Sequence, residues 1–208
     1  MQRSGVTLAL IDYGAGNLRS VANALRVAGA DAVAVTADPD VVARADRIVL
    51  PGVGAFAACM AGLTAIDGMV AALEQRVRGA GAPFLGICVG MQLLADAGEE
   101  HGRHPGLGWI GGTVRAFTPA PALRIPHMGW NDVVPARAHP VLTAGEAYYL
   151  HSYHFADAAA DDVLAMSDHG GPFVAAVGRA NVMGVQFHPE KSQAYGIACL
   201  ESFLAWNP

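Results

Sequence analysis

The sequence predicts an α/β fold with three layers, α/β/α, built on a mainly parallel central sheet with additional antiparallel strands in the C-terminal half. In the first half, short apolar runs alternate with helix-like segments, as in parallel sheets covered on both faces. After about residue 107, short strand-like runs follow one another with only turns between them, which favours antiparallel pairing. The chain has 208 residues, and we expect a single domain over 1–208.

Composition narrows the class of protein. Hydrophobic residues make up 53% of the chain and charged residues 15%, which is enough apolar material for a sheet buried on both faces. The net charge of −5 offers no general attraction for nucleic acid or an anionic membrane, and no apolar run approaches the ~18 residues that span a bilayer. Cys59, Cys88 and Cys199 show neither metal-ligand spacing nor an even disulfide framework. We therefore expect a cytoplasmic protein without a metal or other cofactor.

The first half predicts alternating strands and helices. Strands are expected at residues 6–11, 32–35, 47–50 and 83–87. Helices are expected at residues 18–28, from 39 onward, at 69–77 and at 91–95. Asn17 is the expected N-cap of the first helix, and Gly29 ends it. Asp38 followed by Pro39 is the start signal of the second helix, because proline fits the first helical position.

The second half predicts strands and one closing helix. Strand-like runs lie at residues 107–117, 128–134, 148–153, 163–166, 173–177 and 182–187. Residues 193–206 read as a helix with Ile197, Leu200 and Phe203 on one side. Residues 99–105 and 158–160 are expected to form exposed loops.

Cys88 is the candidate nucleophile. It lies between Gly86 and Gly90, after a buried strand and before a helix, which is the arrangement of the nucleophile elbow of hydrolases. The helix N-terminus would favour the thiolate over the thiol. A small buried hydrophobe at the end of a strand is the alternative interpretation of this cysteine.

His188 and Glu190 supply the other half of a catalytic triad. Pro189 between them disfavours helix at His188, so an extended segment would place the two side chains on the same side. The carboxylate would then hold His188 Nδ1 and leave Nε2 to take a proton from the thiol. The alternative for the motif alone is a strand end with a surface glutamate. His151 and His154 are the rival bases, but neither is in phase with a nearby carboxylate.

A cysteine–histidine pair suits acyl transfer from an amide through a thioester. The tetrahedral intermediate requires hydrogen-bond donors for its oxygen. The backbone N–H of Val89, directly after the nucleophile, is one candidate. The Gly52–Val53 turn is the other, because it follows a parallel strand and should emerge at the same edge of the sheet as Cys88. A tight turn without a role in catalysis is the alternative there.

These motifs resemble the triad-type glutamine amidotransferases, which release ammonia from glutamine. Within that family, four segments resemble the glutaminase subunits of imidazole glycerol phosphate synthase: residues 11–17, 51–56, 128–131 and 188–192. The Pro51-Gly52-Val53-Gly54 loop favours this histidine-pathway assignment, because related glutaminases usually carry a Gly-Gly type of loop. The open alternatives are the glutaminase of another biosynthetic amidotransferase, a cysteine amidase or peptidase, and a non-enzymatic redox-sensing domain.

The resemblance implies substrate and partner residues. Gln92, Ser152 and Tyr153 are expected to hold glutamine. The implied partner is a (β/α)8-barrel cyclase subunit that forms a heterodimer with this chain and uses the ammonia to make imidazole glycerol phosphate and an aminoimidazole carboxamide ribotide. The implied contact residues are Asn17, Trp130, Tyr148 and Lys191. Trp130 lies in a polar setting, as interface anchors often do, and Lys191 lies where a helix dipole disfavours a cation. We expect little glutaminase activity without the partner.

Overall fold

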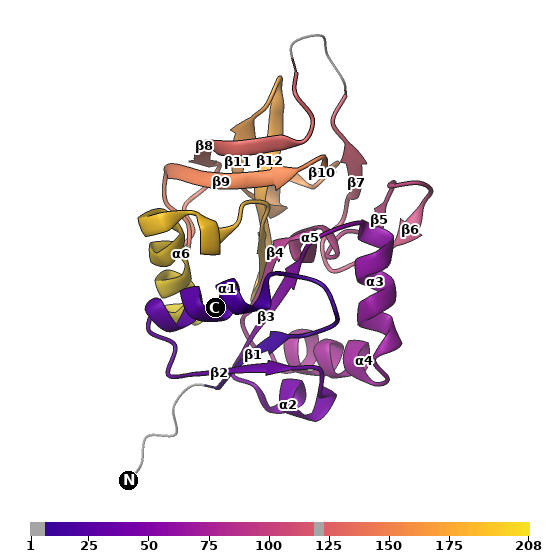
Figure 1. Ribbon diagram of the computed structural model, residues 1–208, viewed down its shortest axis with the longest axis vertical. Coiled ribbons are helices and arrows are strands. Elements are labelled where there is room, and N and C mark those ends of the chain that lie inside the picture. The colour runs from indigo at the N-terminus through magenta and orange to yellow at the C-terminus, as the bar shows by residue number, and fades with distance from the viewer. Residues whose placement is uncertain (1–6, 119–122) are drawn as a thin grey trace.

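The computed structural model describes residues 7–118 and 123–208, and it is built around a sheet of nine strands in the order β2-β1-β3-β4-β13-β12-β11-β8-β9 (Figure 1). One half of this sheet is parallel and consists of β2 (Ala32–Thr36), β1 (Thr7–Ile11), β3 (Arg47–Gly52), β4 (Phe84–Cys88) and β13 (Val182–Val185). The other half is antiparallel and consists of β12 (Pro172–Arg179), β11 (Val163–Asp168), β8 (His127–Pro135) and β9 (Gly145–His151). The predicted mixture of parallel and antiparallel strands is confirmed.

A second sheet of four strands was not predicted. Its order is β10-β7-β5-β6, and its strands are β10 (Tyr153–Ala156), β7 (Thr113–Ala116), β5 (Ala97–Gly98) and β6 (His104–Pro105). The run at 107–117 therefore forms a strand only at its end, because residues 107–112 instead hydrogen-bond as a loop to the chain beyond the elbow. Strands β5 and β6 are too short to show the alternation of apolar and polar residues by which a strand is recognised in a sequence.

Strand β13 joins the two halves of the main sheet. We expected the run at 182–187 to pair antiparallel, but β13 runs parallel to β4 on one side and antiparallel to β12 on the other. A short apolar run does not specify which strands it will pair with or in which direction, so the pairing of β13 is decided only by the three-dimensional packing. The consequence is functional, because β3, β4 and β13 all end at the same edge, and their ends carry Gly52, Cys88 and His188.

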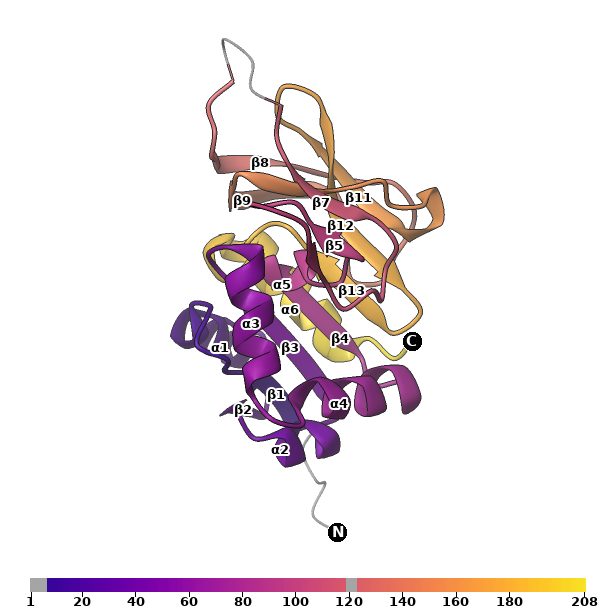
Figure 2. The same ribbon diagram turned by 90° about the vertical axis from the view of Figure 1, so that its right-hand side faces the viewer.

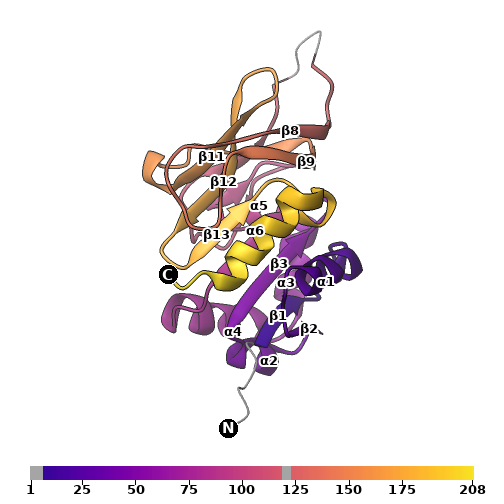
Figure 3. The same ribbon diagram turned by 90° about the vertical axis from the view of Figure 1, so that its left-hand side faces the viewer.

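Helices cover both faces of the parallel half, as predicted (Figures 2 and 3). One face carries α1 (Leu18–Val27) and α6 (Gln193–Ala205), which contact each other. The other carries α2 (Pro39–Arg44), α3 (Phe56–Ala65) and α4 (Met69–Leu73), with a π-helical turn, Glu74–Gly79, after α4. Helix α5 (Val89–Gln92) follows β4 directly, and short 3₁₀ turns lie at Ala160–Asp162 and Pro189–Lys191.

Several helix predictions need correction. Asn17 occupies the N-cap position of α1, but its side chain makes no capping hydrogen bond. Asp38 does cap α2, accepting from the Asp40 N–H at 2.9 Å. Helix α3 was missed because its sequence is apolar on nearly all sides and follows a glycine-rich turn, so no amphipathic period marks it. Val6, the first residue of the predicted strand at 6–11, lies outside the described residues.

One observation concerns membranes. Among the described residues, no single helix is long and apolar enough to cross a bilayer. The helices Phe56–Ala65 and Met69–Gly79 are long and apolar enough only when taken together, and the chain bends by 92° between them.

Candidate active site

The nucleophile elbow is present as predicted. Cys88 ends β4 with a φ of 54° and a ψ of −111°, a conformation that L-residues rarely adopt. The glycines around it allow this turn: a Cβ on Gly86 would lie 2.5 Å from the Gly90 oxygen, and one on Gly90 would lie 1.9 Å from the Leu50 oxygen. Larger residues at either position would displace the backbone, so the two glycines permit the strained turn that presents Cys88.

The Gly52 loop lies beside this elbow. Gly52 is the register partner of Cys88 in the β3–β4 pair, and a Cβ on Gly52 would lie 2.7 Å from the Gly90 nitrogen. The Tyr13 hydroxyl anchors the loop by donating to the Pro51 carbonyl at 2.7 Å. The segment expected to stabilise an oxyanion is therefore packed directly against the nucleophile.

His188 and Glu190 form a buried pair. Nδ1 of His188 donates to Oε1 of Glu190 at 2.8 Å, as predicted, and only 2% of His188 is exposed. The local geometry was predicted wrongly: His188 is extended, but Pro189–Lys191 forms a 3₁₀ turn. The turn arises because proline suits a first helical position, and it brings the carboxylate back to the ring in place of strand alternation. Lys191 ends this turn and lies before α6.

The protonation of His188 depends on its two neighbours. Burial lowers the pKa of His188, but hydrogen bonds and charge interactions with Cys88 and Glu190 raise it by more, to about 10. Because Nδ1 faces Glu190, Nε2 is the ring nitrogen left for the sulfur of Cys88. The raised pKa makes His188 a good acceptor for a proton from Cys88, because the imidazolium that forms is stabilised by Glu190.

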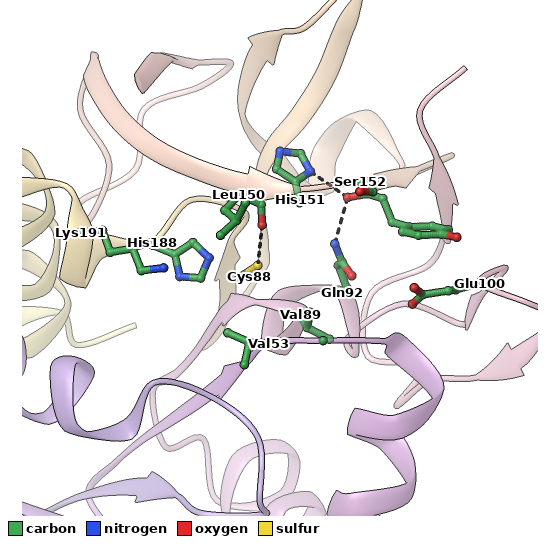
Figure 4. A pocket seen from close by; sticks show the side chains of 12 residues that line it. Val53, Cys88, Val89, Gln92, Glu100, Leu150, His151, Ser152, His188 and Lys191 are labelled. Atoms are coloured by element: carbon green, nitrogen blue, oxygen red, sulfur yellow. Dashed lines mark hydrogen bonds between the residues drawn. The ribbon is translucent and has the colours of Figure 1, made fainter. Parts of the chain in front are cut away.

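A cavity of about 150 Å³ opens over Cys88 (Figure 4). It is lined by Val53, Gly54, Cys88, Val89, Gln92, Glu100, Leu150, His151, Ser152, Tyr153, His188 and Lys191. Most of the predicted site residues therefore meet here, although they come from distant parts of the chain. Glu190 and Gly52 are not among the lining residues, but Glu190 contacts His188 and Gly52 directly precedes Val53.

Gln92 is held by two hydrogen bonds. Its Nε2 donates to the Tyr153 carbonyl and to Oε1 of Gln186, both at 3.0 Å. The Tyr153 carbonyl also accepts from His151 Nδ1 at 2.8 Å. The segment Ser152–Tyr153, between β9 and β10, is thus tied to the helix that follows Cys88.

Sequence reasoning missed two residues of this site. Glu100 carries the only carboxylate among the described lining residues, and its Oε2 accepts from the Phe56 N–H at 2.8 Å. It lies in a segment expected to be only an exposed loop, and no local pattern distinguishes it. Gln186 is fully buried, and its Nε2 lies 3.6 Å from the Cys88 sulfur. Its position two residues before His188 is the one signal that could have drawn attention to it.

His151, a rival base in the sequence, belongs to a separate histidine pair. His127 Nδ1 lies 3.0 Å from His151 Nε2, and Asn131 Nδ2 lies 3.1 Å from His127 Nε2. The Tyr153 carbonyl only accepts, so His151 Nδ1 carries a proton, and His127 must donate to His151. Burial lowers the pKa of His127 to about 4 and that of His151 to about 3. Both rings are therefore neutral at pH 7.

Of the predicted contact residues, only Lys191 lines the cavity, and the others lie on elements that neighbour it. Trp130 on β8 is the register partner of Tyr148 on β9, their ring centroids are 6.2 Å apart, and 47% of Trp130 is exposed. Lys191 Nζ lies 5.9 Å from the centre of the Tyr148 ring and also lines the cavity. Asn17 is exposed before α1, a helix that contacts the 3₁₀ turn of Lys191. In the described part of the chain, no group of three or more His, Cys, Asp or Glu side chains is arranged to hold a metal ion.

Comparison with known proteins identifies the class. The family model described as glutamine amidotransferase class-I matches residues 9–205, so the chain belongs to the class-I glutamine amidotransferase family. A solved structure described as a glutamine amidotransferase has the same fold, with a TM-score of 0.75 at 20% identity over 97% of this chain and 98% of its own.

Two relatives narrow the assignment within that class. The chain is 61% identical to imidazole glycerol phosphate synthase subunit HisH of Zymomonas mobilis subsp. mobilis, over 97% of each chain. It is 56% identical to the same subunit of Rhodospirillum rubrum, over 97% of this chain and 99% of the relative. The chain thus groups with the HisH subunits. The family, fold class and enzyme class predicted from the motifs, a glutamine-hydrolysing subunit of imidazole glycerol phosphate synthase in histidine biosynthesis, are confirmed.

Proposed function

We propose that Cys88, His188 and Glu190 hydrolyse glutamine in this cavity and that the ammonia passes to a (β/α)8-barrel cyclase subunit in a heterodimer with this chain. The observation that carries the proposal is the strained Cys88 turn facing the buried His188–Glu190 pair. The three cysteines of the chain are all free, which supports a cytoplasmic location.

The reaction follows from the positions of these groups. His188 Nε2 takes the thiol proton, and the Cys88 thiolate attacks the side-chain carboxamide carbon of glutamine. The tetrahedral intermediate collapses, the C–N bond breaks, and His188 returns its proton to the leaving nitrogen, which departs as ammonia. Water then attacks the thioester with His188 as base, which yields glutamate and the free thiol. Glu190 keeps the ring oriented throughout.

Backbone groups would stabilise the oxyanion. The Val89 N–H begins α5 directly after the nucleophile, and the Gly52–Val53 loop packs against the same elbow. Each such donor is worth about 2.7–4 kcal/mol of transition-state stabilisation. Gln92, Ser152, Tyr153 and Glu100 would hold the substrate, and the carboxylate of Glu100 suits its α-ammonium group.

The exposed face of the β8–β9 pair is the proposed contact with the cyclase. Met128, Trp130 and Val134 present large apolar side chains there, an uncommon composition for a solvent-facing surface. Two backbone contacts link this face to the site. The His188 N–H donates to the Tyr148 carbonyl at 2.9 Å, and the Leu150 carbonyl lies 3.9 Å from the Cys88 sulfur. A partner docked on this face would lie close enough to influence the nucleophile.

The direct test is to mix the purified chain with its cyclase subunit and measure glutamate formation with and without the cyclase substrate. We expect low activity alone, strong stimulation in the loaded complex, and complete loss in Cys88→Ala. Cys199→Ala, on α6 away from the site, is the matched control and should retain activity. A Cys88→Ala complex that still forms glutamate would refute the proposed nucleophile.

A second test addresses the partner surface. Trp130→Ala should weaken cyclase binding about tenfold or reduce stimulation to a similar degree, because exposed aromatic anchors dominate such interfaces. The thermal transition of the isolated chain should not change. Val27→Ala, an exposed apolar residue on α1, serves as the control. Wild-type affinity together with wild-type stimulation in Trp130→Ala would place the interface elsewhere.

A further inference from the structure

Gln186 is a buried polar side chain that the triad mechanism leaves without a role. It follows β13, lies two residues before His188 and has no exposed surface. Its backbone N–H donates to the Ala175 carbonyl at 2.8 Å, which ties this part of the chain to β12. Its carboxamide reaches toward the active site, where burial of an amide is favourable only if its hydrogen bonds are made.

The orientation of this carboxamide follows from a chain of hydrogen bonds. The Tyr153 carbonyl can only accept, so the atom of Gln92 that faces it at 3.0 Å is the amide nitrogen. The same nitrogen lies 3.0 Å from the Gln186 side chain, which must present its oxygen there. The Gln186 nitrogen is then the atom 3.6 Å from the Cys88 sulfur. The Tyr153 carbonyl thus determines, through Gln92, that Gln186 presents a hydrogen-bond donor to the Cys88 sulfur.

The Cys88 sulfur has contacts of two kinds. In the thiol state, S–H points to the Leu150 carbonyl at 3.9 Å, an acceptor that a thiolate cannot use. The Gln186 N–H is a donor, so it interacts most strongly with the sulfur once the proton has moved to His188. This contact is therefore stronger in the thiolate, the form that attacks, than in the thiol, so it raises the fraction of reactive nucleophile.

We propose that Gln186 is a further catalytic residue, whose amide N–H stabilises and orients the Cys88 thiolate. The proposal rests on the proposed role of Cys88 as nucleophile. Only the thiol proton moves, from sulfur to His188 Nε2, and Gln186 stays neutral and keeps its hydrogens. A second consequence concerns Gln92. Both hydrogens of its amide nitrogen are engaged by Tyr153 and Gln186, so it presents an acceptor oxygen to the cavity.

The test compares two substitutions of similar size. Gln186→Met removes the donor, and Gln186→Glu keeps the acceptor for Gln92 while adding a negative charge near the sulfur. The first measurement is the pH dependence of Cys88 alkylation by iodoacetamide, read by peptide mass spectrometry on the full chain. It requires no turnover, so it still reports if the chain proves inactive on glutamine. Cys59 and Cys199, both buried outside the cavity lining, serve as internal references.

In Gln186→Met we expect the pH of half-maximal alkylation to rise by about one unit and kcat of the cyclase complex to fall about tenfold to a hundredfold, the range for a hydrogen bond to a charged group. Gln186→Glu should show a larger change in the same direction. Gln75→Met, on the exposed π-helical turn, should match the wild type.

A purely structural role predicts a different result. A lowered melting temperature or a raised KM, with wild-type alkylation profiles in both variants, would overturn the proposal. If Gln186→Met does not fold, Gln186→Glu decides alone, because it keeps the volume and the hydrogen bond from Gln92. A wild-type alkylation profile and kcat in Gln186→Glu would then reject the role. A third result is possible: the pH of half-maximal alkylation shifts in the Gln186 variants, but the wild type has no glutaminase activity. That result would reject the proposed function of the enzyme and retain the effect of Gln186 on the Cys88 thiolate.

Discussion

Two groups of buried histidines in this protein have opposite protonation behaviour. His188 is 2% exposed, and its pKa is raised to about 10. His127 and His151 are 4% and 6% exposed, and their pKa values are lowered to about 4 and about 3. Burial opposes a positive charge in all three cases.

The difference lies in the hydrogen-bond partners. His188 faces the Glu190 carboxylate and the Cys88 thiol, which outweigh its burial. The His127–His151 pair faces only neutral groups, namely an amide, a carbonyl and each other's rings. Among these three histidines, the one with an acid beside it has a raised pKa, and the two with neutral partners have lowered pKa values.

The largest expected effect comes from removing that acid or its histidine. His188→Asn should reduce kcat of the cyclase complex by about 10⁶-fold. Glu190→Gln should reduce it by about 10²- to 10⁴-fold, because the orienting group matters less than the groups that exchange protons. Glutamate formation at saturating glutamine measures both. Glu201→Gln, exposed on α6, is the control. If the activity of Glu190→Gln lies within threefold of the wild type, the Glu190 carboxylate is not what distinguishes His188 from the other buried histidines.

The next effect is on stability at acid pH. An unfolded histidine has a pKa of about 6.5, so between that value and about 4 the unfolded chain binds protons that folded His127 and His151 do not. The free energy of unfolding should therefore fall as the pH decreases through this window, by up to about 1.4 kcal/mol per pH unit for each histidine. For His188 the sign is opposite: its stabilisation is complete below about pH 6.5 and is lost as the pH rises through about 10.

Urea unfolding of the isolated chain at several pH values measures this slope. His127→Gln should flatten the acid side by about the contribution of one histidine, whatever its effect on stability at neutral pH. His101→Asn, an exposed histidine, should leave the slope unchanged. An equally steep acid slope in His127→Gln would show that other groups produce it.

The smallest expected effect comes from giving His127 a carboxylate partner like the one that His188 has. Asn131→Asp would place a carboxylate about where the amide now lies, 3.1 Å from His127 Nε2. We expect the pKa of His127 to rise by about one to three units, which NMR titration of its ring protons would measure. Asn131→Ser removes the amide without adding charge and should leave the pKa low. A low pKa in Asn131→Asp would mean that burial, and not the partner, controls this site.

The sequence alone determined the features that arise from neighbouring residues. The elbow follows from glycines that flank Cys88 and permit a backbone that other residues would block. The contact between His188 and Glu190 follows from their separation by one proline, although the chain achieves it through a 3₁₀ turn and not an extended strand. The alternation of strands and helices, and hence the layered fold, likewise follows from local periodicity.

Only the tertiary structure decided which distant residues meet. The parallel pairing of β13 with β4 brings His188 and Gln186 to Cys88, and nothing in residues 182–187 specifies that neighbour. Glu100 and the His127–His151 pair also depend on contacts between segments far apart in the chain. Local sterics and short-range hydrogen bonds depend on adjacent residues, whereas the register between distant strands results from packing of the whole core. The motifs of the site could therefore be predicted, but the positions of Glu100, Gln186 and the His127–His151 pair could not.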